Sequence, residues 1–153
     1  SVREVHQATL DVDPDRFLTG VFACWDAGRE ELRWVNCGHP PPLIVRVDGE
    51  IDQLDGEHTY PLGILERERS FPVLCTRLGT GDRLLLYTDG MTERRRDDGT
   101  LVGVDGIRRV LAELRGGSAA AIVRGLQDAV IAASPEPLRD DATLLVLAPV
   151  GER

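Results

Sequence analysis

The sequence predicts an α+β fold: a series of antiparallel strands, then two helices, then a last strand. Short runs of β-branched and aromatic residues alternate with turn signals up to Thr88. Two amphipathic helical patterns then precede one more apolar run. Strands followed by helices are typical of α+β domains, whereas α/β domains alternate the two.

The chain starts with a helical stripe over residues 2–10, and seven strand candidates follow. The strands are predicted at residues 17–25, 32–37, 43–47, 51–54, 71–76, 83–88 and 143–147. The Asp48-Gly49 pair is a hairpin signal between the third and fourth strands, and the prolines at 40–42 must interrupt the ladder after the second. The run 83–88 is the most apolar, so we expect it to be buried on both faces of its sheet.

Two helices separate the last two strands. The first is predicted near residues 105–114 and ends at Gly116-Gly117. The second spans residues 118–133, with Ser118 as its N-cap, and Pro135 closes it. Together they supply enough chain to return the last strand to the sheet that contains residues 83–88.

Length and charge narrow the possible functions. A chain of 153 residues fits one compact domain. Its formal net charge is −8, from 26 acidic and 18 basic residues, so the basic footprint of a nucleic-acid-binding protein is absent. The one basic cluster, Arg94-Arg95-Arg96, is followed directly by two aspartates. We expect it to be a solvated loop, with phosphate binding as the alternative.

Cysteine usage and hydropathy indicate an intracellular protein. Cys24, Cys37 and Cys75 form an odd set without paired-ligand spacing, which argues against a disulfide framework or a structural zinc site. All three sit in apolar runs, so buried reduced thiols are expected. No run of about 18 apolar residues exists that could span a membrane, and the start of the chain lacks a signal-peptide profile. We expect a cytoplasmic location and no membrane partner.

Carboxylates flank the two most apolar strands at ends that can meet. Asp89 follows the strand 83–88, and Asp140 and Asp141 precede the strand at 143–147. If these strands pair antiparallel, the carboxylates share one rim of the sheet, where their repulsion favours a hard divalent cation such as Mg²⁺ or Mn²⁺. An ordinary turn with polar flanks is the alternative interpretation. Glu93, just beyond, either orients the loop or a water or is a solvated loop charge.

Three motifs resemble the SpoIIE/RsbU-type branch of the metal-dependent protein phosphatases, the phosphatase 2C-like superfamily. They are Asn36-Cys37-Gly38-His39-Pro40-Pro41-Pro42-Leu43, Leu85-Leu86-Tyr87-Thr88-Asp89-Gly90-Met91-Thr92-Glu93 and Asp140-Asp141-Ala142-Thr143-Leu144-Leu145-Val146-Leu147. Each alone is weak, but three in order at family-like spacing are specific, and the resemblance covers residues 17–147.

The resemblance implies a central antiparallel β-sandwich flanked by helices, with two Mn²⁺ or Mg²⁺ ions at one edge. It implies that Asp89 and Asp140 are catalytic metal ligands, that Asp141 is their neighbour at the metal site, and that Gly90 lets the backbone approach the metal edge closely. It also implies hydrolysis of phosphoserine or phosphothreonine on a bacterial regulatory protein, often an anti-sigma antagonist of the STAS type.

One family motif is absent. The family's domain has a Gly-Asp-Val-x-Gly-His-Gly segment, which supplies the aspartate that bridges both metals, and residues 1–10 resemble the helix that follows it. We therefore expect residues 1–153 to be the C-terminal two-thirds of a single domain in a longer phosphatase, with a naturally shortened, silent relative as the alternative. The isolated chain is expected to have little or no activity, and its exposed strand edge favours a homodimer.

Other residues receive structural interpretations. His39 is expected to bond the backbone and fix its proline-rich turn. His6 and His58 are expected at the surface, and Trp25 and Trp34, on adjacent strands, are expected to form a core pair.

Three functions stay open: a metal-dependent phosphatase, a non-catalytic module that binds a regulatory partner, and an unrelated α+β domain with one structural cation.

Overall fold

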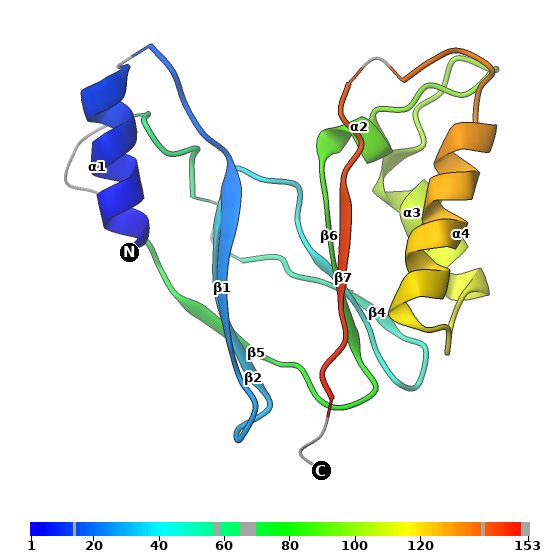
Figure 1. The fold of residues 1–153 in the computed structure, drawn as a ribbon, viewed down its shortest axis with the longest axis horizontal. Coiled ribbons are helices and arrows are strands. Elements are labelled where there is room, and N and C mark those ends of the chain that lie inside the picture. Colours follow the sequence, from blue (N-terminus) through cyan, green and yellow to red (C-terminus); the bar gives the residue numbers. More distant parts are fainter. Residues whose placement is uncertain (14, 57–58, 65–69, 139, 151–153) are drawn as a thin grey trace. The chain divides into compact units, whose positions relative to one another are not determined.

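The computed structural model describes residues 1–13, 15–56, 59–64, 70–138 and 140–150. The chain divides into two compact units. The first comprises Ser1–Pro41 and Asp55–Leu78, and the second comprises Pro42–Leu54 and Gly79–Arg153. Each unit has its own antiparallel sheet and its own helical part (Figure 1).

The first unit combines one helix with a three-stranded sheet. The helix α1 is Val2–Val12, and the strands β1, β2 and β5, which lie in this order in the sheet, are Gly20–Asp26, Glu31–Cys37 and Leu74–Arg77. Val2 and Val5 of α1 pack on a small core of Val35, Cys37 and Leu62. The helix thus covers the Cys37 end of β2.

The second unit has a four-stranded sheet in the order β4-β3-β6-β7. Its strands are β3 (Leu43–Val45), β4 (Ile51–Gln53), β6 (Arg83–Tyr87) and β7 (Leu144–Leu147), and its helices are α2 (Asp89–Thr92), α3 (Gly103–Glu113) and α4 (Ala119–Ala132). α3 and α4 lie side by side and pack on the sheet (Figure 1). The core joins side chains of β3 and β6, such as Leu43 and Leu85, to Ile107 and Leu126 of the helices.

The predicted α+β class is confirmed, and most elements lie within a few residues of their predicted bounds. Ser118 caps α4 as expected, because its hydroxyl oxygen accepts a hydrogen bond from Ala121 N at 3.2 Å. The third strand ends at Val45 rather than at residue 47, because the amide of Arg46 already closes the turn onto Glu50 O at 2.8 Å. The short helix α2 was not predicted, since four residues carry no periodic pattern.

His6 is buried, so its predicted surface position is wrong. It is 0% exposed, and its Nδ1 accepts a hydrogen bond from Gly63 N at 3.1 Å. The ring also meets Phe71 edge to face, with ring centroids 5.4 Å apart. A helix face that contains a histidine gives no local sign of burial, because the covering segments come from more than fifty residues away. The expectation for His58 lies outside the described residues.

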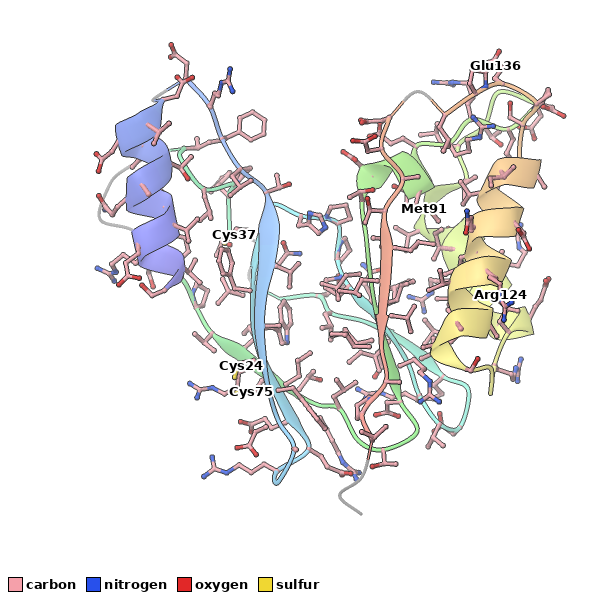
Figure 2. All side chains as sticks on the ribbon, viewed as in Figure 1. Cys24, Cys37, Cys75, Met91, Arg124 and Glu136 are labelled. Carbon is pink, nitrogen blue, oxygen red and sulfur yellow. The ribbon has the colours of Figure 1, made fainter. Side chains whose placement is uncertain are left out.

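The cysteines differ from one another in burial, so the prediction of three buried thiols is wrong for two of them. None of the three forms a disulfide within the described residues (Figure 2 labels their positions). Cys37 is buried, but Cys24 and Cys75 are exposed. In the sheet register both exposed cysteines are paired with Arg33 of β2, one from each neighbouring strand. This row lies beyond the part of the sheet that the small core under α1 covers.

The two tryptophans share one face of the β1-β2 pair. Trp25 is opposite Leu32, and Trp34 is opposite Ala23, so the two rings stand in diagonal register. Trp34 is buried, whereas Trp25 is half-buried and donates from Nε1 to Leu78 O at 3.0 Å. Trp34 is therefore the core residue of the pair.

Across the described part of the chain, no helix combines the length and apolarity needed to cross a bilayer.

Asp82 connects two parts of the second unit. It is only 7% exposed, and its carboxylate accepts hydrogen bonds from Gly79 N at 3.0 Å, Val47 N at 3.1 Å and Arg46 Nη1 at 3.0 Å. Arg46 also pairs with the more exposed Asp52 at 2.7 Å. The carboxylate of Asp82 thus joins the turn before β6 to the end of β3.

We expect Asp82→Ala to lower the free energy of unfolding by about 2–4 kcal/mol, because two amides and one guanidinium lose a buried acceptor. Urea denaturation measures the change in the free energy of unfolding. Asp52→Ala is the matched control, since it removes the exposed partner of the same arginine, and it should cost no more than about 1 kcal/mol. Equal losses in both variants would contradict this role for Asp82.

Candidate functional site

The antiparallel pairing of β6 with β7 brings the predicted carboxylate-bearing segments together. Tyr87 is opposite Leu144 in the register. One residue further, Thr88 N donates to Thr143 O at 3.1 Å. The end of β6 therefore lies beside the start of β7, as the sequence predicted.

The hydroxyl of Thr88 secures the same junction. Thr88 Oγ1 donates to Asp141 O at 2.7 Å and accepts from Thr143 N at 2.9 Å. One side chain thereby fixes the backbone on both sides of Ala142. Sequence reasoning did not single out Thr88, although a threonine directly before the Asp-Gly pair was visible.

Gly90 lies so close to the opposite segment that no side chain fits. It is buried, and a Cβ atom built on it would be 2.5 Å from Asp141 O and 3.2 Å from Ala142 N. A glycine is needed here because of this close approach, since the contact is with backbone that cannot swing aside. Gly90 thus brings two backbone segments close together, and its role beside a metal ion stays a prediction.

The three aspartates are exposed and stand at the edge that this junction creates. Asp89 is the first residue of α2, and its Oδ1 accepts from Gly90 N at 3.0 Å. Asp140 Oδ1 likewise accepts from Asp141 N at 2.8 Å. Within the described residues none of the three carboxylates forms an ion pair with an arginine. They remain accessible from solvent.

A cavity of about 210 Å³ adjoins this edge. Its lining residues come from the segment after β6 and from the segment before β7: Gly90, Glu93, Arg94, Arg95, Glu136, Leu138 and Asp140. Asp140 and Gly90 thus share a cavity wall, and Asp89 is not among the lining residues. Glu93 is exposed and belongs to this wall.

The carboxylates at this edge meet part of the ligand requirement of a hard cation. Among the described residues there is no group of three or more histidine, cysteine, aspartate or glutamate side chains that could hold a metal ion. Mg²⁺, however, is usually held by one or two carboxylates, with waters and substrate phosphate completing its octahedron. Asp89 and Asp140, brought to one edge from two strand ends, match that smaller requirement.

Arg94 is buried, so the expectation that residues 94–96 form a solvated loop is wrong for its first member. The side chain of Arg94 is surrounded by backbone carbonyls near the end of α4, whereas Arg95 is exposed and donates to Gly99 O at 2.9 Å. Arg96 is half-buried and donates to Leu101 O at 2.5 Å. The charge of Arg94 predicted an exposed side chain. Its carbonyl partners lie more than thirty residues away in sequence, so no local pattern indicated burial.

In the first unit, the turn at His39 is held by its neighbour Asn36. Asn36 Oδ1 accepts from His39 N, and Asn36 Nδ2 donates to His39 O, both at 2.8 Å. Gly38 has a φ of 69°, a left-handed conformation that glycine adopts freely. The backbone of His39 is therefore part of the turn, and the side-chain amide of Asn36 helps to hold it.

Comparison with known proteins gives a match over almost the whole chain. Residues 1–149 match the family described as Stage II sporulation protein E (SpoIIE). The chain is also similar to the phosphoserine phosphatase RsbU of Bacillus subtilis (strain 168). The identity is 27% over 138 residues, which make up 90% of this chain and 40% of RsbU.

Two solved structures share the fold. The phosphatase domain of SpoIIE from Bacillus subtilis, presoaked with Mn, has a TM-score of 0.73 at 20% identity, and the match covers 99% of this chain and 65% of that one. The RsbU and RsbW domains of Rv1364c from Mycobacterium tuberculosis give a TM-score of 0.74 at 28% identity, over 95% of this chain and 41% of that one. The chain thus spans less than two thirds of each of the three proteins.

We expect Gly90→Ala to destabilise the second unit by about 1–3 kcal/mol, because the added methyl group would collide with Asp141 O and push the two strand ends apart. Thermal or urea unfolding measures the loss. Gly28→Ala is the control, because its Cβ would lie at an ordinary contact distance of 3.5 Å from the side chain of Asp26. A Gly90→Ala protein as stable as this control would mean that the close approach is absent in solution.

Proposed function

Because the chain belongs to the SpoIIE family, we propose that it is the C-terminal part of a metal-dependent phosphatase domain. The domain would hydrolyse phosphoserine or phosphothreonine on a bacterial regulatory protein. The observation that carries this proposal is the pairing of Tyr87 with Leu144, which joins the segments of Asp89 and Asp140 at one sheet edge.

In this proposal Asp89 and Asp140 are the ligands that this chain contributes to Mn²⁺ or Mg²⁺. The bound ion would supply a water acidic enough to attack phosphorus near neutral pH. Gly90 keeps the two segments close, and Thr88 holds the backbone of Asp141, whose carboxylate we assign as a neighbour of the metal site. The exposure of all three carboxylates leaves room for a phosphorylated side chain.

The remaining ligands would come from outside residues 1–153. The Gly-Asp-Val-x-Gly-His-Gly segment, which carries the bridging aspartate in the family, is absent from this sequence. The shares of RsbU and of the SpoIIE phosphatase domain that the chain spans, 40% and 65%, are consistent with a partial domain. We therefore propose that residues 1–153 need a further segment for activity.

The substrate we propose is a phosphorylated STAS-type anti-sigma antagonist or a similar regulatory protein. Support comes from the similarity to RsbU, a phosphoserine phosphatase, and from the family resemblance of the motifs. A cytoplasmic location and a homodimer belong to the same proposal.

A second candidate function is a non-catalytic phosphatase-like module that binds a regulatory partner. It is favoured by one observation: within the described residues, fewer than three potential ligands gather at any point. Both candidates use the same fold, so only metal binding and turnover distinguish them.

We expect Asp89→Asn and Asp140→Asn each to lower Mn²⁺-dependent phosphatase activity by more than about 100-fold in the full natural polypeptide, because each amide keeps the shape but removes the anionic ligand. Hydrolysis of p-nitrophenyl phosphate and of a phosphoserine peptide provides the measurement. Asp128→Asn, an exposed carboxylate on α4, is the control and should retain full activity. Full activity in both site variants would refute the assignment.

The isolated chain of residues 1–153 should show no Mn²⁺-dependent turnover above background, whereas the same chain with its native upstream segment should be active. The physical reason is that two carboxylates cannot bridge and hold two metal ions tightly. Turnover by the isolated chain would contradict this expectation. If the extended form were also inactive but still bound a regulatory protein, the second candidate function would be favoured.

A further inference from the structure

Arg94 is a buried cation that pairs with carbonyl oxygens instead of a carboxylate. The residue is 8% exposed, and within the described part of the chain it forms no ion pair. A buried charge is costly unless its hydrogen-bonding groups are satisfied. Here four of the five N–H groups donate to backbone carbonyls, so the arrangement depends on the path of that backbone.

Two of the four bonds lie at the C-terminal end of α4, one to Val130 within the helix and one to Ser134 just past the C-cap residue Ala133. Arg94 Nε donates to Val130 O at 3.3 Å, and Nη2 donates to Ser134 O at 2.7 Å. The last turn of α4 has no basic residue of its own, and its terminal carbonyls need donors. A cation at this end also interacts favourably with the helix dipole. If Arg94 served only as a helix cap, these two bonds would be enough.

The other two bonds lie further along the loop. Arg94 Nη2 donates to Glu136 O at 2.5 Å, and Nη1 donates to Pro137 O at 2.9 Å. Figure 2 shows Glu136 on the loop past the end of α4. The φ angles of Pro135 and Pro137 are restricted by their rings, so fixing these carbonyls leaves the loop little freedom. Pro137 lies three residues before Asp140.

The Asp140 segment is therefore held on both sides by residues that flank Asp89. On its N-terminal side Arg94 binds Pro137 O, and on its C-terminal side Thr88 binds Asp141 O. Arg94 is itself fixed, because its carbonyl accepts from Val102 N at 2.8 Å. Side chains of the segment from Thr88 to Arg94 thus form hydrogen bonds with the backbone both before and after Asp140.

We propose that Arg94 is a positioning residue that sets the place of Asp140 relative to Asp89 by clamping the loop 134–137. The inference rests on the proposed function in so far as the two carboxylates hold a metal ion. Arg94 does not touch the substrate or the ion. Four of its five N–H groups donate to carbonyls of α4 and the loop, and Arg95 is the exposed arginine of the cavity wall.

The test compares Arg94→Met with Arg94→Lys in the full natural polypeptide. Mn²⁺ affinity, measured by titration calorimetry, should fall about 10-fold or more in Arg94→Met, as for other residues that orient metal ligands. The Mn²⁺ affinity of Arg94→Lys should fall less, because an ammonium group can still donate to some of the carbonyls. Arg124→Met is the control, because it removes an exposed arginine from α4, the helix whose end Arg94 contacts (Figure 2). Its Mn²⁺ affinity should stay within about two-fold of that of the parent protein.

Hydrogen exchange on the metal-free protein gives a second readout that does not depend on the ion. Arg94→Met should exchange faster at residues 134–143, while β3 and β6 keep their protection. Ile122→Val, which weakens the same core without touching the loop, should change neither the local exchange nor the Mn²⁺ affinity. These two readouts separate positioning from general stability.

The outcomes are distinct. Unchanged exchange at 134–143 and unchanged affinity in Arg94→Met would overturn the clamp. A parent protein that binds no Mn²⁺ would refute the proposed function, while the exchange experiment would still decide the role of Arg94. Should Arg94→Met fail to fold, Pro137→Gly takes its place, because it loosens the loop and leaves the cap at Val130 intact. Parent-like exchange at 134–143 in Pro137→Gly would also overturn the proposal.

Discussion

The hydrogen bonds around Thr88 are the constraint on which the candidate site depends. They extend the β6-β7 ladder by one step and join residues 53 and 55 positions apart in sequence. Without them the strand ends could fray, as strand ends do when only solvent competes for their backbone groups. With them, the hydroxyl group of Thr88 holds the ends of β6 and β7 together at this edge of the sheet. The positions of Gly90 and Asp141 follow from that edge.

The charges at this edge have two different fates. Asp89, Asp140 and Asp141 are exposed, so water and salt screen their mutual repulsion and the fold tolerates them together. A divalent cation would neutralise them more effectively than screening does. Arg94, only five residues after Asp89, is buried and neutralised by carbonyl dipoles. The carboxylates therefore stay accessible from solvent, whereas the guanidinium of Arg94 makes its hydrogen bonds inside the fold.

The buried arginine also explains how a proline-containing loop can support a defined site. A loop with few regular hydrogen bonds usually has several conformations. Three loop carbonyls share one planar guanidinium with Val130 O of α4, which restricts the loop to conformations that point these three at a common centre. That geometry is demanding, and lysine could not reproduce it with a single ammonium.

The sequence by itself determined the local elements and the chain order. The Asp48-Gly49 turn, the Ser118 cap and the apolar run that became β6 were readable because each depends on residues close in sequence. The approach of the segments that carry Asp89 and Asp140 was also predictable, because an antiparallel pair must bring one strand's end to the other's start. Only the tertiary structure decided the burial of His6 and Arg94 and the exposure of Cys24. The environment of these side chains comes from segments far along the chain or from where a covering element stops, and no local periodicity encodes either.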